Sequence, residues 1–161
     1  MATAEDWIEY ACVRAVLDHP LARVWRHVGR FGELDRWVDG VTACSVEGAG
    51  LGAVRTVTRN GAVVRERLDR FDADAHELSY LILEPHALPA SDVRGTITLR
   101  ATESGATEMV WCSVASQFRA PPQALGERIE RFYSASIQGL GRLLDASRDS
   151  PDAEAAIDVQ R

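Results

Sequence analysis

An arginine and a glutamate in the first half of the chain are predicted to face each other across a β-hairpin. The turn is Asn60-Gly61, which favours a two-residue type I′ turn because both of its residues accept positive φ angles. Counting back from this turn places Arg55 opposite Glu66. A guanidinium can bind a carbonyl or carboxylate oxygen, and a neighbouring carboxylate can take and return a proton. The pair therefore points to proton transfer on a carbonyl compound.

The same register assigns one face of the hairpin to the interior. The side chains that share the face of Arg55 and Glu66 are paired as Arg59 with Ala62, Val57 with Val64 and Ala53 with Leu68. The opposite face is more polar and is expected to meet solvent. An unpaired charge on the inner face would be costly, so Arg55 and Glu66 should bind each other. A plain cross-strand salt bridge is the alternative interpretation, and a one-residue slip in register would weaken the functional one.

A third candidate catalytic group is Tyr80. Alternation along Leu78–Ile82 places its hydroxyl on the same face as Leu78 and Ile82. A core tyrosine bonded to the backbone is an equally simple interpretation. The residues predicted to line a ligand cavity beside these groups are Trp37, Val57, Val64, Leu68, Ile82, His86, Leu88, Trp111, Phe132 and Ser136. His86 belongs to the Pro85 to Pro89 loop at the expected entrance, where a solvated histidine is the alternative.

Neither a cofactor nor a metal is expected. The glycines of Gly50-Ala-Gly52 join two strands rather than a strand and a helix, so they indicate a turn and not a nucleotide-binding loop. Cys12, Cys44 and Cys112 are far apart in sequence and odd in number, which predicts reduced, buried thiols rather than a disulfide or a zinc site. All 18 basic residues are arginines, so a lysine Schiff base is excluded.

Hydrophobic periodicity predicts the elements that position these groups. Alternation predicts a first strand at residues 8–17, and Pro20 with Leu21, Val24 and Val28 predicts a short helix, followed by a second short helix or turn at 31–37. Further strands are expected at 41–47, 53–59, 62–71, 78–84, 93–101 and 108–118. Most junctions are short enough for antiparallel hairpins.

After Pro121-Pro122 the period changes to that of a long helix with one apolar stripe. Gly139 and Gly141 lie within it and are expected to weaken it by roughly 1 kcal/mol each relative to alanine, while making room for a ligand or a strand. The order of elements predicts an α+β fold, in which a curved seven-stranded antiparallel sheet wraps around the C-terminal helix and leaves an internal cavity. We expect one domain over residues 1–146 and a disordered tail over 147–161.

Composition limits the partners. The net charge of −6 without a basic cluster argues against nucleic acid. No apolar run approaches the roughly 20 residues of a membrane span, and the N-terminus lacks the features of a secretory signal, so a cytoplasmic location is expected by default. The expected partner is a small hydrophobic molecule. The apolar residues Leu81 and Leu83 could support a homodimer or another protein contact.

Several short motifs resemble those of one superfamily. They are Pro20 with Val24-Trp25, Phe31-Gly32 with Trp37, Gly50-x-Gly52-x-x-Arg55, Glu66-Arg67-Leu68, Leu78-Ser79-Tyr80, and Gly105 ahead of Trp111. In order and spacing, over residues 8 to 145, they resemble the START-like or SRPBCC superfamily, in particular its polyketide cyclase/dehydrase branch. This resemblance implies a helix-grip fold. It also implies that Arg55 and Glu66 occupy the positions thought to act on substrate in the related lachrymatory-factor synthase.

The resemblance extends to plant abscisic-acid receptors, with one difference. Their long gate loop corresponds here only to Arg59-Asn60-Gly61, which argues against a receptor, and His86-Ala87-Leu88-Pro89 resembles their latch loosely. The expected activity is that of a cofactor-independent cyclase, dehydratase or isomerase acting on a small hydrophobic, polyketide-like carbonyl compound. The alternative is a non-catalytic protein that binds or carries such a ligand.

Overall fold

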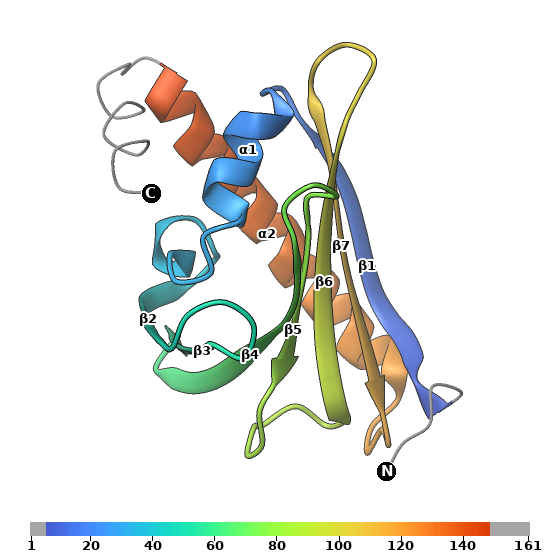
Figure 1. Ribbon diagram of the computed structural model, residues 1–161. Helices are drawn as coiled ribbons and strands as arrows, with labels where there is room; N and C mark the ends of the chain where they lie inside the picture. The colour runs from blue at the N-terminus through green and yellow to red at the C-terminus, as the bar shows by residue number, and fades with distance from the viewer. Residues whose placement is uncertain (1–5, 149–161) are drawn as a thin grey trace.

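The computed structural model of the chain describes residues 6–148 (Figure 1). The elements in chain order are β1 (Ile8–Leu17), α1 (Leu21–Val28), the 3₁₀ helix η2 (Leu34–Arg36), β2 (Val41–Glu47), β3 (Val54–Arg59), β4 (Ala62–Asp72), β5 (Glu77–Ile82), β6 (Ser91–Ala101), β7 (Thr107–Ser116) and α2 (Pro122–Arg148). The predicted order is confirmed. Of the expected tail, Ser147 and Arg148 are the last residues of α2, and 149–161 lie outside the described residues.

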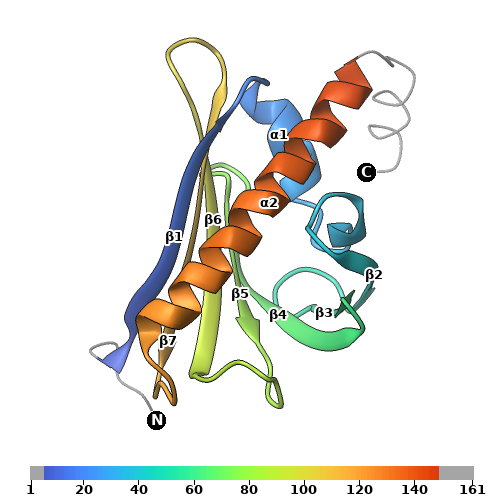
Figure 2. The ribbon, with the colours of Figure 1, turned by 180° about the vertical axis from the view of Figure 1, so that it is seen from behind.

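The strands form one antiparallel sheet in the order β1-β7-β6-β5-β4-β3-β2. The first strand of the chain therefore pairs with the last, and β1 and β2 form the two edges of the sheet. Figure 2 shows α2 running diagonally across the inner face of the sheet, while the strands β2 to β4 curl around one side of it. This is the α+β helix-grip architecture that the sequence predicts. The curl matters because it turns the inner face of the β3–β4 hairpin toward the helix.

The register of the β3–β4 hairpin is confirmed. Arg55 pairs with Glu66, Val57 with Val64 and Arg59 with Ala62. Asn60 and Gly61 have φ angles of 49° and 81°, as a turn with two left-handed residues requires. The turn chemistry thus fixes which side chains of the hairpin reach the interior.

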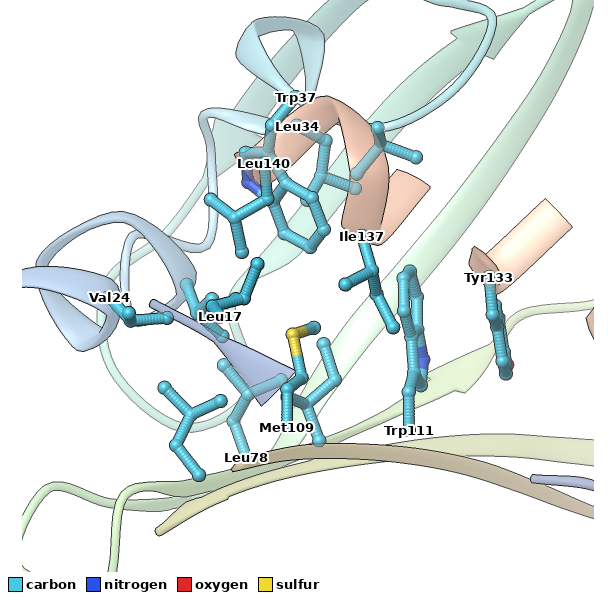
Figure 3. Packing of buried hydrophobic residues seen from close by; sticks show 14 of the residues in the cluster. Leu17, Val24, Leu34, Trp37, Leu78, Met109, Trp111, Tyr133, Ile137 and Leu140 are labelled. Atoms are coloured by element: carbon cyan, nitrogen blue, oxygen red, sulfur yellow. The ribbon is translucent and has the colours of Figure 1, made fainter. Parts of the chain in front are cut away.

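The core lies between α2 and the middle of the sheet. Leu140 and Ile137 of α2 pack toward Met109 of β7 and Leu78 of β5, and Val24 of α1 closes one end (Figure 3). Along β7 every second side chain is buried, which is the alternation expected of a strand with one face on a core. This packing anchors the strands that carry the candidate site.

One of the two central glycines of α2 is explained by a backbone segment that packs very close to the helix. A Cβ atom at Gly139 would collide with the carbonyl oxygen of Trp37, whereas a Cβ at Gly141 would lie 3.6 Å from the Leu17 side chain, an ordinary contact. Gly139 therefore lets the loop after η2 pack on the helix, and Gly141 has no such role. No helix within residues 6–148 is long and apolar enough to cross a membrane.

The prediction of three reduced, buried thiols is wrong for two of them. Cys12 on β1 and Cys112 on β7 are register partners and form a disulfide, with Cα atoms 4.0 Å apart. Both point to the outer face of the sheet, since Ala11 and Trp111 beside them are buried on the inner face. The sequence does not predict this pairing, because the two cysteines are 100 residues apart and meet only when the first strand pairs with the last. Cys44 is free and half-buried.

The two glycines of α2 should respond oppositely to alanine. Gly141→Ala should stabilise the fold by up to about 1 kcal/mol, because alanine favours the helix and meets only an ordinary contact. Gly139→Ala should destabilise it by about 1–3 kcal/mol, because the new methyl group displaces the Trp37 carbonyl. Urea unfolding at pH 7 measures both, and equal effects of the two substitutions would contradict the close approach.

The stability of the fold should fall between pH 6.5 and 5.5 because of His27. This side chain is 4% exposed on α1, and burial, followed by the charge of Arg36, lowers its pKa to about 4. The unfolded chain takes up this proton near pH 6.5 and the folded chain only near 4, so acidification through that window favours unfolding. Wild type should lose about 1 kcal/mol more than His27→Leu over this range. Parallel losses in urea titrations would show that His27 is not responsible.

Candidate functional site

The Arg55–Glu66 pair is buried on the inner face of the β3–β4 hairpin. Nε of Arg55 donates to Oε2 of Glu66 at 2.6 Å, and Nη2 lies 2.6 Å from the same oxygen. The exposed fractions of the two side chains are 4% and 12%. In the described part of the chain, nothing donates a hydrogen bond to the other carboxylate oxygen, Oε1. One oxygen of Glu66 is therefore held, and the other is free to meet a ligand.

Arg55 has further partners within the protein. Its Nη1 donates to the carbonyl oxygen of Phe31 at 3.1 Å. Its guanidinium carbon lies over the rings of Phe31 and Tyr80, 4.1 and 4.7 Å from their centres. Such contacts stabilise a desolvated cation. Arg55 is thus largely occupied in holding Glu66, rather than extended toward the space beside it.

Tyr80 provides a phenol that keeps its proton. Its hydroxyl accepts a hydrogen bond from Nε1 of Trp111 at 3.1 Å. The interaction with the Tyr133 side chain also lowers the pKa of Tyr80. Burial, and then the charge of Glu66, nevertheless raise the pKa of Tyr80 above its ordinary value. Because its oxygen accepts from Trp111, the O–H of Tyr80 remains available to donate.

A glycine on the neighbouring strand makes room for Tyr80. Gly95 of β6 is its register partner, and a Cβ atom there would collide with the phenol ring and hydroxyl. The ring therefore lies directly across the β6 backbone. This is a close approach that only glycine permits at this position.

A pocket of about 250 Å³ lies beside these groups. Its lining includes the three candidate catalytic residues Arg55, Glu66 and Tyr80 and, of the predicted ligand-binding residues, Val57, Val64, Ile82, His86, Leu88, Trp111 and Phe132. These come from β3, β4, β5, β7, α2 and the β5–β6 loop. Most of this lining is aliphatic or aromatic, so the pocket suits an apolar molecule.

Three predicted ligand-binding residues belong to the surrounding core instead. Trp37 is 5% exposed and packs on Trp111 with ring centres 5.8 Å apart. Leu68 is buried opposite Tyr80. Ser136 accepts from the backbone N–H of Asp39 and donates to the carbonyl of Phe132, so both capacities of its hydroxyl are used in holding the loop on α2.

Sequence reasoning did not assign several lining residues to the pocket. They are Leu34, Val38, Val41, Arg59, Ala87, Arg128 and Ile129. The sequence pattern was sufficient to predict two of these residues, since Arg59 shares the inner face of the hairpin and Ile129 belongs to the apolar stripe of the helix. Arg128 is an exposed residue beside that stripe, and Leu34 and Val38 come from the irregular segment around η2. No hydrophobic periodicity therefore predicts that these three residues face the pocket.

His86 closes the pocket at the β5–β6 loop. Its side chain is 1% exposed, so the interpretation as a solvated histidine is wrong. Nδ1 accepts the backbone N–H of Leu88 at 3.2 Å, and Nε2 lies 3.1 Å from Oε1 of Glu84. The bond from Leu88 places the proton of a neutral ring on Nε2. His86 therefore fixes the shape of the loop at the pocket.

Potential metal ligands gather elsewhere. Within residues 6–148, three such side chains come together at Glu9, Cys12 and Cys112, none of which lines the pocket. There the two sulfurs are bonded to each other. The ionisable side chains of the pocket lining are thus Glu66, Tyr80, His86 and the arginines.

Comparison with known sequences gives one match. The model of the family described as "Polyketide cyclase / dehydrase and lipid transport" matches residues 12–145, which is most of the chain. No curated protein sequence matches the chain.

Several solved structures share the fold. A putative uncharacterized protein from Bacillus thuringiensis has a TM-score of 0.75 and 19% identity over 83% of this chain and 97% of its own. The protein XoxI from Bacillus cereus has a TM-score of 0.72 and 20% identity over 83% and 95%. A protein from Thermobifida fusca has a TM-score of 0.75 and 23% identity over 86% and 93%. At these identities the likeness establishes the fold and leaves activity open.

Removing one partner of the Arg55–Glu66 pair should be strongly destabilising. Arg55→Met leaves Glu66 with an unpaired, largely buried charge, so urea unfolding at pH 7 should show a loss of about 3 kcal/mol. Replacing both residues, with Glu66→Leu added, should recover most of that loss. The matched control is Arg14→Met, which breaks the Arg14–Glu108 pair on the outer face, where Arg14 is 65% exposed. That change should cost less than about 1 kcal/mol. Equal losses from Arg55→Met and Arg14→Met would contradict the burial of the Arg55–Glu66 pair.

Proposed function

Since this chain belongs to the polyketide cyclase/dehydrase and lipid transport family, we propose that its pocket binds a small apolar carbonyl compound and that Glu66 moves a proton on it. The observation that carries this proposal is the state of the Glu66 carboxylate. Arg55 holds Oε2, while Oε1 has no hydrogen-bond donor among the described residues and Glu66 lines the pocket. A fixed carboxylate with one free oxygen in an apolar pocket is a suitable general base.

The first step is removal of a proton from the carbon next to the carbonyl group. The C–H bond breaks, the proton passes to Oε1 of Glu66, and the electron pair moves into the carbonyl group to give an enolate. The O–H of Tyr80 donates a hydrogen bond to the enolate oxygen. The phenol is protonated at neutral pH, and burial raises its pKa further above its ordinary value. The positive charge of Arg55, which contacts both Glu66 and the Tyr80 ring, stabilises the negative charge that develops on the enolate.

The enolate can then react in three ways that need no electron acceptor. Return of the proton from Glu66 to a different carbon gives isomerisation. Transfer of that proton to a hydroxyl on the β-carbon releases water and gives dehydration. Attack of the enolate carbon on a second carbonyl, whose oxygen takes the proton, gives cyclisation. The lyase and isomerase activities expected of the chain thus share one base.

A carrier of an apolar ligand is the second candidate function. The observation that favours it is the closure of the Arg55–Glu66 pair, in which Nε, Nη1 and Nη2 of Arg55 all have protein partners. Such a pair could serve only to stabilise the hairpin. In a carrier the pocket would hold its ligand unchanged, and Glu66 would contribute no chemistry.

Hydrogen exchange on a model ketone tests the two functions without knowledge of the natural substrate. We expect wild type to speed the replacement of α-hydrogens of 2-tetralone by deuterium in D₂O, observed by proton NMR. Glu66→Gln should reduce the enzyme-dependent rate by about 10²–10⁴-fold, because the amide cannot accept the proton. Tyr80→Phe should reduce it by about 10-fold or more through the lost hydrogen bond.

Glu108→Gln is the matched control for Glu66→Gln. It also removes a carboxylate paired with an arginine on a neighbouring strand, but on the outer face, and it should leave the exchange rate unchanged. If wild type binds 2-tetralone and exchanges its hydrogens no faster than Glu66→Gln does, Glu66 is not a base and the carrier function stands.

A further inference from the structure

Two arginines of the pocket lining are not neutralised by Glu66. Arg59 at the end of β3 and Arg128 near the start of α2 both line the pocket, together with Arg55. Glu66 is the only carboxylate among the described lining residues, and Arg55 already binds it. The lining therefore carries an excess of positive charge, in a chain whose net charge is −6.

Both arginines lie near one aromatic residue, Phe132. The guanidinium carbon of Arg59 lies over Phe132, 4.0 Å from the ring centre. Phe132 follows Arg128 by four residues on α2, so the two side chains are neighbours on one face of the helix. Arg59 and Arg128 thus both lie near Phe132 in the pocket lining, where Arg128 is exposed and Arg59 half-buried.

Neither arginine is strongly bound to a carboxylate. Nε of Arg59 donates to the backbone carbonyl of Asp39 at 2.9 Å, and its Nη2 lies 3.7 Å from Oδ2 of that residue, whose side chain is 50% exposed. Arg128 has no acidic partner within ion-pair distance among residues 6–148. A partly exposed pair at 3.7 Å is weak, so both guanidinium groups keep donors for a ligand.

We propose that the ligand of this pocket is a small apolar molecule with one carboxylate, whose head group lies between Arg59 and Arg128. The inference rests on the proposed function and names its substrate class, a keto acid. The apolar body fills the pocket and the reacting carbonyl meets Glu66, while the carboxylate remains at the rim. A volume of about 250 Å³ is just below the usual range of ligand sites, roughly 300–1,000 Å³, so the body has the size of one or two fused rings.

Two naphthalene derivatives of equal size provide the test. 2-Naphthoate carries the carboxylate, and 2-naphthamide is its neutral analogue with the same number of non-hydrogen atoms. In calorimetric titrations of the full chain at pH 7 and low salt, we expect 2-naphthoate to bind about 10-fold more tightly. Arg59→Gln and Arg128→Gln should each weaken 2-naphthoate about 3- to 5-fold and leave 2-naphthamide unchanged.

Arg131→Gln is the matched control. Arg131 lies three residues after Arg128 on the same helix and is exposed, but it faces a different part of the surface. Its loss should not change either affinity. Equal binding of the two probes, or an equal effect of Arg131→Gln and Arg128→Gln, would overturn the carboxylate site while leaving the apolar pocket intact. Failure of both probes to bind would overturn the proposed function as well.

Discussion

The contact between Arg55 and Glu66 is the interaction on which the rest of the site depends. A charge so deeply placed is tolerable only with a partner, and the partner must come from the adjacent strand. The cation then draws in the Phe31 carbonyl and two aromatic rings, which brings the segment after α1 and the strand β5 to the hairpin. The hairpin, the strand that follows it and the segment after α1 are thus organised around one buried ion pair, and the pocket is the space left beside it.

Much of this arrangement can be predicted from residues that are close together in sequence. The dipeptide Asn60-Gly61 fixes a turn, the turn fixes the register, and the register fixes which face carries the pair. Periodicity likewise identifies most strands and α2, because they have one face on the core. These features depend on residues close together in sequence, and for them elementary rules are sufficient.

Features created by the tertiary fold escaped the same reasoning. The Cys12–Cys112 disulfide exists only because β1 pairs with β7 in the folded sheet. The role of Phe31 is carried by its backbone carbonyl as well as its ring, so its side chain type gives no hint of half its function. Ser136 shows the converse, since it is a predicted ligand contact whose hydroxyl is instead satisfied by the loop at Asp39. Sequence periodicity predicts which face a side chain lies on, but not which residue it contacts there.

The glycine beneath Tyr80 has a consequence for the history of this chain. Because any side chain at position 95 would occupy the volume of the phenol, the two positions cannot be exchanged independently. A lineage that replaces Gly95 must first replace Tyr80, and a lineage that gains Tyr80 must already have glycine at position 95. Covariation of positions 80 and 95 should therefore mark the members of the family that share this pocket wall, whatever their overall identity.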